Sequence, residues 1–250
     1  MSKVYEALQH ARTERDQVLS AEKRPISEIR RTEIPSILGL PALQMEREMS
    51  RLHQSLMTLL SDSQNYIIQF IGSRENEGTS TIVREFGRFL GEKCNMSVLL
   101  VDGDPLRMSQ HQVFRHHPGV SLQQISHEGG ILDKAIFQVR NSRVFLCRLA
   151  GQIEGKSSLS FSTNVQDLWN SLRKKFQFVL IDSAAMDSDA DPLALCSSVD
   201  GVVLVVEAEK TRSQVVANMK DRVVQNGGNV LGLVFNKQRY YIPEWIYKRL

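Results

Sequence analysis

The stretch Tyr66–Thr81, YIIQFIGSRENEGTST, decides the fold of this chain. Its first part, Tyr66–Ile71, is an almost continuous apolar run, which is typical of a strand covered on both faces of a parallel sheet. A polar loop, Gly72–Gly78, then leads into Thr79–Thr81 and an amphipathic segment that continues to about Lys93. A strand, a tight loop and a helix N-terminus form an anion site, because free backbone N–H groups and the helix dipole converge there. The stretch therefore predicts a phosphate-binding P-loop.

The letters of this loop depart from the P-loop signature, which has Gly, four residues, Gly, Lys and then Ser or Thr. In the matching window, Ser73 stands in place of the first Gly and Thr79 in place of the Lys. We nevertheless expect this loop to supply the nucleotide contacts. The predicted contact residues are Ser73, Arg74, Glu77, Gly78, Thr79, Ser80 and Thr81.

Size and composition limit the class of protein. At 250 residues the chain is long enough for one good-sized core with an appendage. A net charge of +3 does not by itself indicate a nucleic-acid partner, and we expect none. Three cysteines without paired spacing favour a reducing compartment and argue against a zinc site. Without a signal-peptide core or an apolar run that could span a bilayer, the chain is expected to be soluble and cytoplasmic.

Two units are expected along the chain, an N-terminal helix with a linker over 1–40 and an α/β domain over 41–250. Apolar residues at helical spacing predict a helix over 2–19, either leaning on another surface or frayed in solvent. Three prolines among charged residues mark the linker that follows. A further amphipathic helix is predicted from 41 to about 60, directly before the first strand.

After the loop helix, apolar strands alternate with helical segments. Strands are predicted over 97–102, 144–149, 178–182, 201–206 and 230–236, and helical pieces over 110–114, 122–125, 131–138, 165–175, 192–198 and 213–225. This alternation predicts a doubly wound, mainly parallel sheet. Ligands of such sheets bind at the carboxyl ends of the strands. Three of these ends, Gly72, Asp102 and Asp182, are therefore expected to meet in one crevice.

The aspartates at the strand ends have two interpretations. Asp182 follows four apolar residues, as a Walker B aspartate does, and would hold magnesium together with Ser80. Asp102 and Asp104 would orient the nucleophile or share the metal. The alternative is that Asp182 caps the helix that follows its strand and that Asp102 and Asp104 lie in a solvated turn.

Three motifs at these strand ends carry a resemblance to a known family. They are VLLVDGD at 98–104, FVLIDS at 178–183 with a later Asp191, and VDGVVLVVEAEKTR at 199–212. Together with their surroundings, from about Glu46 to Arg239, they resemble the bacterial tyrosine kinase (BY-kinase) family. Its members are P-loop proteins of the ParA/MinD-like class that serve capsule and exopolysaccharide export. The flanks MSKVYEALQHA at 1–11 and NKQRYYIPEWIY at 236–247 are similar to stand-alone members from exosortase-associated polysaccharide clusters.

The resemblance implies a set of ligands and partners. The cofactor would be ATP or ADP with magnesium, and Asp102, Asp104 and Asp182 would be the catalytic residues of an active member. The partner would be a membrane polysaccharide co-polymerase of the chain-length determinant type, or a kinase paralogue. Through such a partner the chain would lie at the inner membrane, and it could form a homo-oligomer.

Departures from the family pattern fall in the phosphate loop itself. Family kinases carry a Lys where this chain has Thr79, and no Lys occurs between Ser61 and Glu92. Losing one preorganised donor of this kind costs roughly two to three orders of magnitude in rate. Glu75 and Glu77 are expected to set negative charges where phosphates would lie.

Further departures surround the loop. Asn76 replaces a family Gly, Ala184 and Ala185 replace paired prolines, and the arginine of the second motif is shifted to Arg107. Arg74 or Arg84 is a candidate substitute for the missing lysine.

Two more segments have open interpretations. Tyrosines near the C-terminus of family kinases are autophosphorylated, and Tyr240, Tyr241 and Tyr247 match that placement, but the same tail also reads as a short apolar helix that docks, which we favour. Glu46–Arg51 lies where the family has an oligomerisation helix, and its charges equally suit a solvated helix face.

The sequence thus predicts a non-catalytic or weakly active BY-kinase-like protein of exopolysaccharide biosynthesis. One alternative is an active tyrosine autokinase or ATPase that uses a substitute arginine. The other is a positioning ATPase of the MinD/ParA kind, against which the kinase-like flanks speak.

Overall fold

The computed structural model describes residues 45–60, 65–105, 107–114, 119–128, 130–139, 142–150, 165–188 and 191–238. The predicted N-terminal helix, the linker and the tyrosine tail lie outside these ranges. None of the helices within them is long and apolar enough to cross a membrane.

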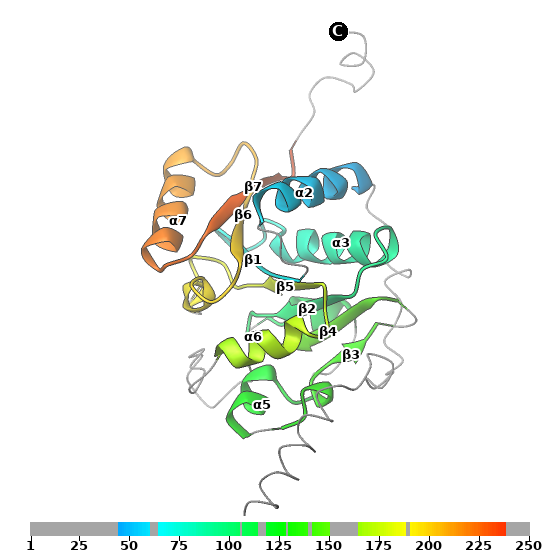
Figure 1. Ribbon diagram of the computed structural model, residues 1–250. Helices are drawn as coiled ribbons and strands as arrows, with labels where there is room; N and C mark the ends of the chain where they lie inside the picture. The colour runs from blue at the N-terminus through cyan, green and yellow to red at the C-terminus, as the bar shows by residue number, and fades with distance from the viewer. Residues whose placement is uncertain are drawn as a thin grey trace, which may run out of the picture.

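A seven-stranded sheet in the order β3-β4-β2-β5-β1-β6-β7 forms the centre of the molecule (Figure 1). All neighbouring strands pair in parallel except β3 and β4, which are antiparallel. The strands are β1 (Tyr66–Gly72), β2 (Val98–Asp102), β3 (Phe137–Gln138), β4 (Val144–Arg148), β5 (Phe178–Asp182), β6 (Gly201–Glu207) and β7 (Val230–Asn236).

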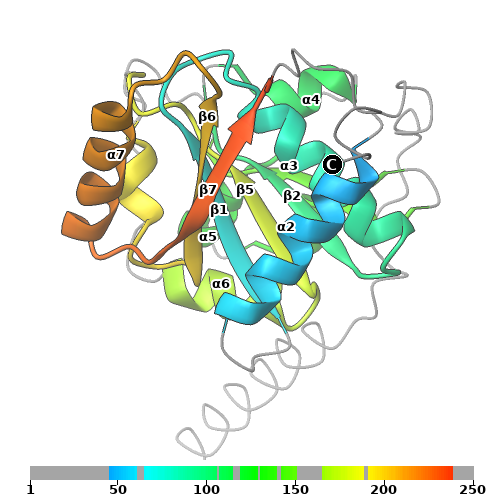
Figure 2. The ribbon, with the colours of Figure 1, turned by 90° about the horizontal axis from the view of Figure 1, so that it is seen from above.

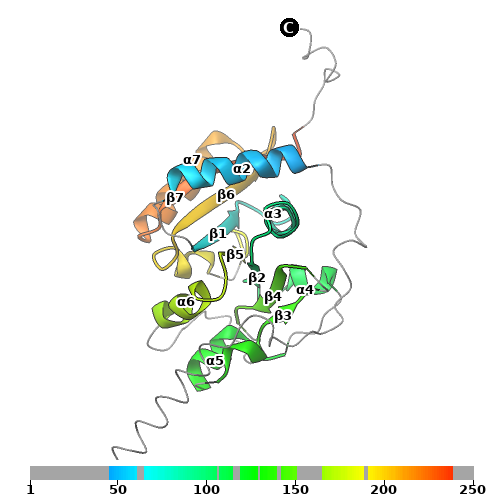
Figure 3. The same ribbon diagram turned by 45° about the vertical axis from the view of Figure 1, so that its right-hand side comes forward.

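Helices cover both faces of this sheet (Figures 2 and 3). On one face lie α2 (Glu46–Leu59) and α3 (Thr79–Glu92), and on the other α5 (Leu122–Glu128), α6 (Val165–Arg173) and α7 (Ser213–Gln225). Shorter pieces are α4 (Ser109–Val113), the 3-10 helix η3 (Leu132–Lys134) and the 3-10 helix η4 (Pro192–Leu195). This is the predicted doubly wound, mainly parallel α/β fold.

The buried strand β1 explains why helices are needed on both sides. Ile68 and Phe70 pack with Phe86 of α3 in the core of one face, while Ile67 packs with Trp169 of α6 on the other. Every residue of β1 is buried, which matches the near-continuous apolar run in its sequence.

One predicted helix is wrong. The segment predicted as a helix over 131–138 forms only the single 3-10 turn η3 and then the short strand β3. Phe137 pairs with Leu146 and Gln138 with Phe145, so the segment completes the edge of β4. The aromatic and β-branched residues of 136–139 suit an edge strand, and the free ladder of β4 outweighs the weak local helical pattern.

Candidate functional site

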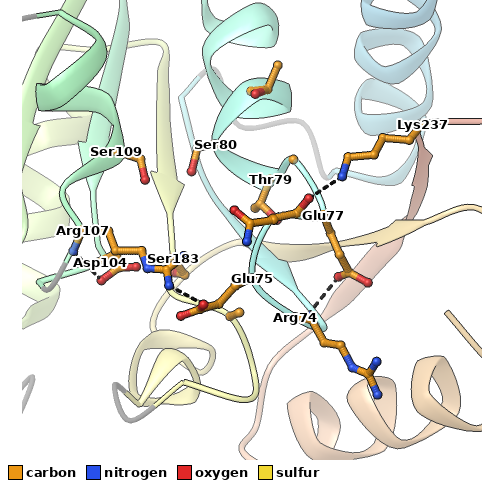
Figure 4. Close-up of a pocket in the computed structure, with 14 residues that line it drawn as sticks. Arg74, Glu75, Glu77, Thr79, Ser80, Asp104, Arg107, Ser109, Ser183 and Lys237 are labelled. Atoms are coloured by element: carbon orange, nitrogen blue, oxygen red, sulfur yellow. Dashed lines mark hydrogen bonds and ion pairs between the residues drawn. The ribbon is translucent and has the colours of Figure 1, made fainter. Parts of the chain in front are cut away.

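A cavity of about 340 Å³ lies at the carboxyl ends of the central strands (Figure 4). Its wall comes from the β1–α3 loop, the first turn of α3, the segments after β2 and β5, and the residue after β7. The lining residues are Arg74, Glu75, Asn76, Glu77, Gly78, Thr79, Ser80, Thr81, Asp104, Arg107, Ser109, Ser183, Ala185 and Lys237. The cavity thus contains six of the seven residues predicted to contact a nucleotide, all except Ser73, which is buried at the base of the loop.

The carboxylate of Glu77 holds this loop together. It accepts hydrogen bonds from the backbone N–H groups of Ser73 (2.7 Å) and Arg74 (3.0 Å) and from the Ser73 hydroxyl (2.7 Å). It also accepts from the Thr211 hydroxyl (2.6 Å) and the Glu207 N–H (3.4 Å), beyond the end of β6. The side chain therefore ties the start of the loop to the β6–α7 connection.

This placement corrects the expectation that Glu77 would set its charge where phosphates lie. The Glu77 residue is 4% exposed, and its carboxylate is engaged by the loop's own donors. Burial alone would raise the pKa of Glu77, but the hydrogen bonds from Thr211, Ser73, Arg74 and Glu207 outweigh it and lower the pKa. Glu77 is thus an ionised structural group of the loop.

Backbone geometry in the loop requires particular residues. Gly78 precedes α3 with a φ of 92°, and a Cβ there would lie 2.1 Å from Nδ2 of Asn236. Asn76, at the family's Gly position, has a φ of 64°. Asparagine tolerates this left-handed conformation better than most side chains do, so the replacement keeps the loop's path.

The first turn of α3 forms the anion-binding part of the cavity. Thr79, Ser80 and Thr81 line it, at the end of the helix where the backbone N–H groups have no acceptor within the helix. The Thr79 hydroxyl would lie 2.6 Å from a Cβ on Gly72, so it packs against the start of the loop. Thr79 does not supply the positive charge that a lysine would bring to this position.

Basic residues around the cavity are already engaged or turned away. Arg107 forms an ion pair with Glu75. Lys237 donates to the Asn76 carbonyl (2.5 Å) and pairs with Glu207 (3.2 Å). Figure 4 shows the guanidinium of Arg74 pointing away from the labelled residues of the other wall.

The other candidate substitute, Arg84, is not among the described residues that line the cavity. It lies within α3, with one guanidinium nitrogen 3.5 Å from the Thr81 hydroxyl, and burial lowers its pKa. Neither arginine proposed from the sequence therefore stands where the lysine is missing.

The predicted Walker B residue lies behind the cavity wall. Asp182 is 2% exposed and is not among the described lining residues. It accepts a hydrogen bond from the Ser80 hydroxyl, and its Oδ2 accepts from Nε2 of Gln110 at 2.8 Å. The same Nε2 donates to the Ser80 carbonyl, also at 2.8 Å.

The neighbouring aspartate, Asp102, is likewise buried and hydrogen-bonded within the chain. Asp102 pairs with Asp182 across β2 and β5 and is 2% exposed. Its Oδ2 accepts from the backbone N–H groups of Gln110 (3.0 Å) and His111 (3.1 Å) and lies 3.0 Å from Nδ1 of His111. Of the three predicted aspartates, only Asp104 lines the cavity.

Enclosure changes the acidity of this pair. Burial, and then the nearby charge of Asp102, raise the pKa of Asp182 to about 7, although hydrogen bonds from Gln110 and Ser80 act in the opposite direction. The protonated form of Asp182 is therefore favoured to a higher pH than that of an ordinary aspartate.

The arrangement does not fit a magnesium ion at Ser80 and Asp182. Magnesium requires near-octahedral oxygen ligands, usually with several waters. One oxygen each of Asp102, Asp182 and Gln110 has no partner among the described residues, but one Asp182 oxygen already accepts from an amide. The described residues include no group of three or more His, Cys, Asp or Glu side chains placed to hold a metal.

Sequence reasoning missed several residues of this site. Thr211 and Lys237 follow the ends of β6 and β7, so the rule that ligands gather at strand ends could have found them. Gln110 and His111 lie in a segment with a weak helical pattern. Nothing in their spacing indicates that both turn toward the aspartates.

Curated relatives of this chain are named as tyrosine kinases. The chain is 26% identical to the putative tyrosine-protein kinase CapB of Staphylococcus aureus over 58% of its own length and 64% of that protein's. It is 24% identical to the tyrosine-protein kinase CpsD of Streptococcus pneumoniae over 71% and 78%. It also matches 23% of the succinoglycan biosynthesis transport protein ExoP of Rhizobium meliloti, at 24% identity. The chain thus spans just under two thirds of CapB and less than a quarter of ExoP.

Solved structures agree in fold. The kinase domain of the Escherichia coli tyrosine kinase ETK has a TM-score of 0.73 at 19% identity, covering 86% of each chain. The chimerical protein CapA2B2 has a TM-score of 0.70 at 19% identity, covering 86% of this chain and 97% of that one. The cell division ATPase MinD of Pyrococcus furiosus has a TM-score of 0.56 at 21% identity, covering 74% and 78%. No protein-family profile matches. In its strand-end motifs, its P-loop NTPase-like fold and its tyrosine-kinase relatives, the chain resembles the bacterial tyrosine kinase (BY-kinase) family.

Proposed function

We propose that this chain is a non-catalytic or weakly active BY-kinase-like protein of exopolysaccharide biosynthesis. It acts by binding a membrane polysaccharide co-polymerase or a kinase paralogue, with a nucleotide as an optional ligand of its P-loop. The observation that carries this proposal is the enclosure of Asp102 and Asp182 behind the wall of a phosphate-sized cavity whose loop has no lysine.

The charges around the cavity support a loss of catalysis. A kinase needs a fixed cation on the transferred phosphate and a metal or base at the aspartates. Here Arg107 and Lys237 are held by Glu75 and Glu207, and Gln110 donates to Asp182. Two of the basic residues around the cavity and the predicted Walker B aspartate thus already have partners within the chain.

Autophosphorylation with radiolabelled ATP tests the catalytic part of the proposal. The purified full chain is compared with Asp182→Ala and with an active family kinase as the positive control. We expect no more label in the wild-type chain than in the variant. Label that enters the wild type and is lost in Asp182→Ala would establish an active kinase instead.

A second candidate, an active enzyme with a substitute arginine, is favoured by one observation. Arg107 lines the cavity together with Asp104, whereas Arg84 is not among the described lining residues and the guanidinium of Arg74 points away from the other wall (Figure 4). In that case ATP turnover would be measurable, and it would collapse in Arg107→Ala while surviving in Arg74→Ala. Equal turnover in both variants would remove this candidate.

Membrane association tests the partner. The likeness to ExoP, named as a transport protein, supports a role beside such a membrane protein. The chain is expressed with and without a polysaccharide co-polymerase from the same genome, and membranes are sedimented. We expect the chain to sediment with membranes only when the co-polymerase is present. Equal sedimentation in both cases would contradict this role.

A further inference from the structure

Gln110 is a buried polar residue that contacts both strand-end aspartates. Its exposed fraction is 0%. Its side-chain Nε2 donates to Oδ2 of Asp182, and its backbone N–H donates to Oδ2 of Asp102. A single neutral residue therefore occupies the position between two carboxylates that lie side by side on β2 and β5.

Chemistry fixes the orientation of the Gln110 amide. Both acceptors of Nε2, the Asp182 carboxylate and the Ser80 carbonyl, lie at 2.8 Å. Reversing the amide would place Oε1 against the Ser80 carbonyl, which has no hydrogen to donate. The electropositive edge of the amide thus faces Asp182, where a hydrated cation would otherwise place its charge.

The surrounding contacts hold Gln110 in this position. His111 is 2% exposed, and its N–H and Nδ1 both contact the Asp102 oxygen that Gln110 also contacts. Moving Gln110 away would disturb these contacts and leave the Asp182 Oδ2 without the donor described here. The cost of a buried unsatisfied charge makes such a movement unfavourable.

We propose that Gln110 replaces the divalent cation of this site. Its backbone N–H and its side-chain amide donate to Asp102 and Asp182 from within the chain and exclude a divalent metal, so that the cavity takes the phosphate groups of a nucleotide without one. This inference deepens the proposed function, since it concerns the same site, but its test needs neither a nucleotide nor a partner.

Manganese titration of the nucleotide-free full chain, followed by electron paramagnetic resonance, tests this proposal. The variants are Gln110→Ala, which removes the amide, and Gln110→Glu, which adds a third carboxylate. The matched control is Gln69→Ala. Gln69 is equally buried, and its Nε2 also has two acceptors, the Ser183 hydroxyl at 2.8 Å and the Pro192 carbonyl at 2.6 Å.

We expect the wild type and Gln69→Ala to bind manganese only weakly, as exposed carboxylates do. Gln110→Ala and Gln110→Glu should gain one site at least about tenfold tighter, because carboxylate oxygens are then released for a hard cation. Adding Asp182→Asn to Gln110→Glu should abolish the gained site. If the single Gln110 variants are too unstable for titration, thermal melting from a low starting temperature provides the readout. Manganese should then raise the melting temperature of Gln110→Glu but not that of the wild type.

Two results would overturn the proposal. If the wild type binds manganese as tightly as Gln110→Glu, Gln110 does not exclude the metal. If neither Gln110 variant gains a site or is stabilised by manganese, the amide is not the group that excludes it. Both results are separate from the autophosphorylation test, which reports on catalysis alone.

Discussion

The carboxylates on the two sides of the cavity are held by different kinds of donor. Figure 4 shows the side that contains Glu77. In the β1–α3 loop, Glu77 turns inward to the loop's own N–H groups and leaves the first turn of α3 facing the cavity. Across the cavity, Asp102 and Asp182 are covered by Gln110 and His111. The phosphate-binding loop can therefore keep its conformation even though the aspartates that would bind a cation are covered by other side chains. The shape of the loop depends on Glu77, and the missing lysine is not needed for it.

The largest expected effect comes from removing that internal support. Glu77→Ala deletes the acceptor of five hydrogen bonds and leaves buried N–H groups unsatisfied. We expect the free energy of unfolding to fall by about 3 kcal/mol in urea denaturation. The exposed neighbour Glu75→Ala is the control and should stay within about 0.5 kcal/mol of the wild type. A small effect of Glu77→Ala would show that the loop does not depend on this carboxylate.

On the other side of the cavity, the buried Asp182 should make the free energy of unfolding depend on pH. The pKa of Asp182 is raised to about 7 from the ordinary aspartate value of 3.8, so the folded chain holds a proton that the unfolded chain releases between these values. Stability from this group is therefore lost as pH rises across that window, and about 2 to 3 kcal/mol of the loss falls above pH 5.

Asp182→Asn removes this titration. In metal-free buffer, the free energy of unfolding of the variant should increase relative to that of the wild type as pH is raised from 5 to 8. Urea denaturation at each pH measures the difference, with the exposed Asp187→Asn as the control. Parallel pH profiles for Asp182→Asn and the wild type would mean that the aspartate wall is not closed as described.

Restoring the lysine should improve binding without restoring chemistry. Thr79→Lys adds a cation to the open wall, and we expect ATP to bind about tenfold more tightly by calorimetry in the absence of metal. Because Gln110 still covers Asp182, no autophosphorylation should appear. Thr58→Lys, on the exposed side of α2, is the control. Label incorporated by Thr79→Lys would show that the aspartates are accessible after all.

The smallest expected effect concerns the ion pair between the two walls. Glu75→Ala releases Arg107 to meet a phosphate, and we expect pyrophosphate affinity to rise only a few-fold, roughly threefold, because both side chains are half exposed. Glu48→Ala, on the exposed side of α2, should leave the affinity unchanged. A fall in affinity on removing Glu75 would mean that this residue supports the anion site.

The sequence was sufficient for the sheet because its strands are covered on both faces. Five apolar runs after β1 predicted β2, β4, β5, β6 and β7 to within a residue or so at either end. The strand β3 was missed because two residues pairing with an edge carry almost no periodic signal. Parallel topology also predicted that Gly72, Asp102 and Asp182 meet in one crevice. Asp102 and Asp182 do lie side by side on β2 and β5, but none of the three is among the described residues that line the cavity.

Side-chain directions within the site were not predictable in the same way. Whether Glu77 turns toward the phosphates or away depends on donors near Glu207 and Thr211, more than a hundred residues later in the chain. The cover over Asp182 likewise depends on Gln110 in a separate segment. These side-chain directions are determined by packing between segments far apart in the sequence, which patterns in a single sequence do not reveal.

The end of β7 is tied directly to the phosphate loop. Asn236 donates to the carbonyl of Glu77 at 2.7 Å, and Lys237 to that of Asn76 at 2.5 Å. Among the strands that the structure describes, β7 lies at the edge of the sheet and pairs with β6. A mechanical load on the chain just past Gln238 therefore reaches the loop through two adjacent side chains. Binding of the C-terminal segment by another molecule is therefore expected to affect the conformation of the phosphate loop.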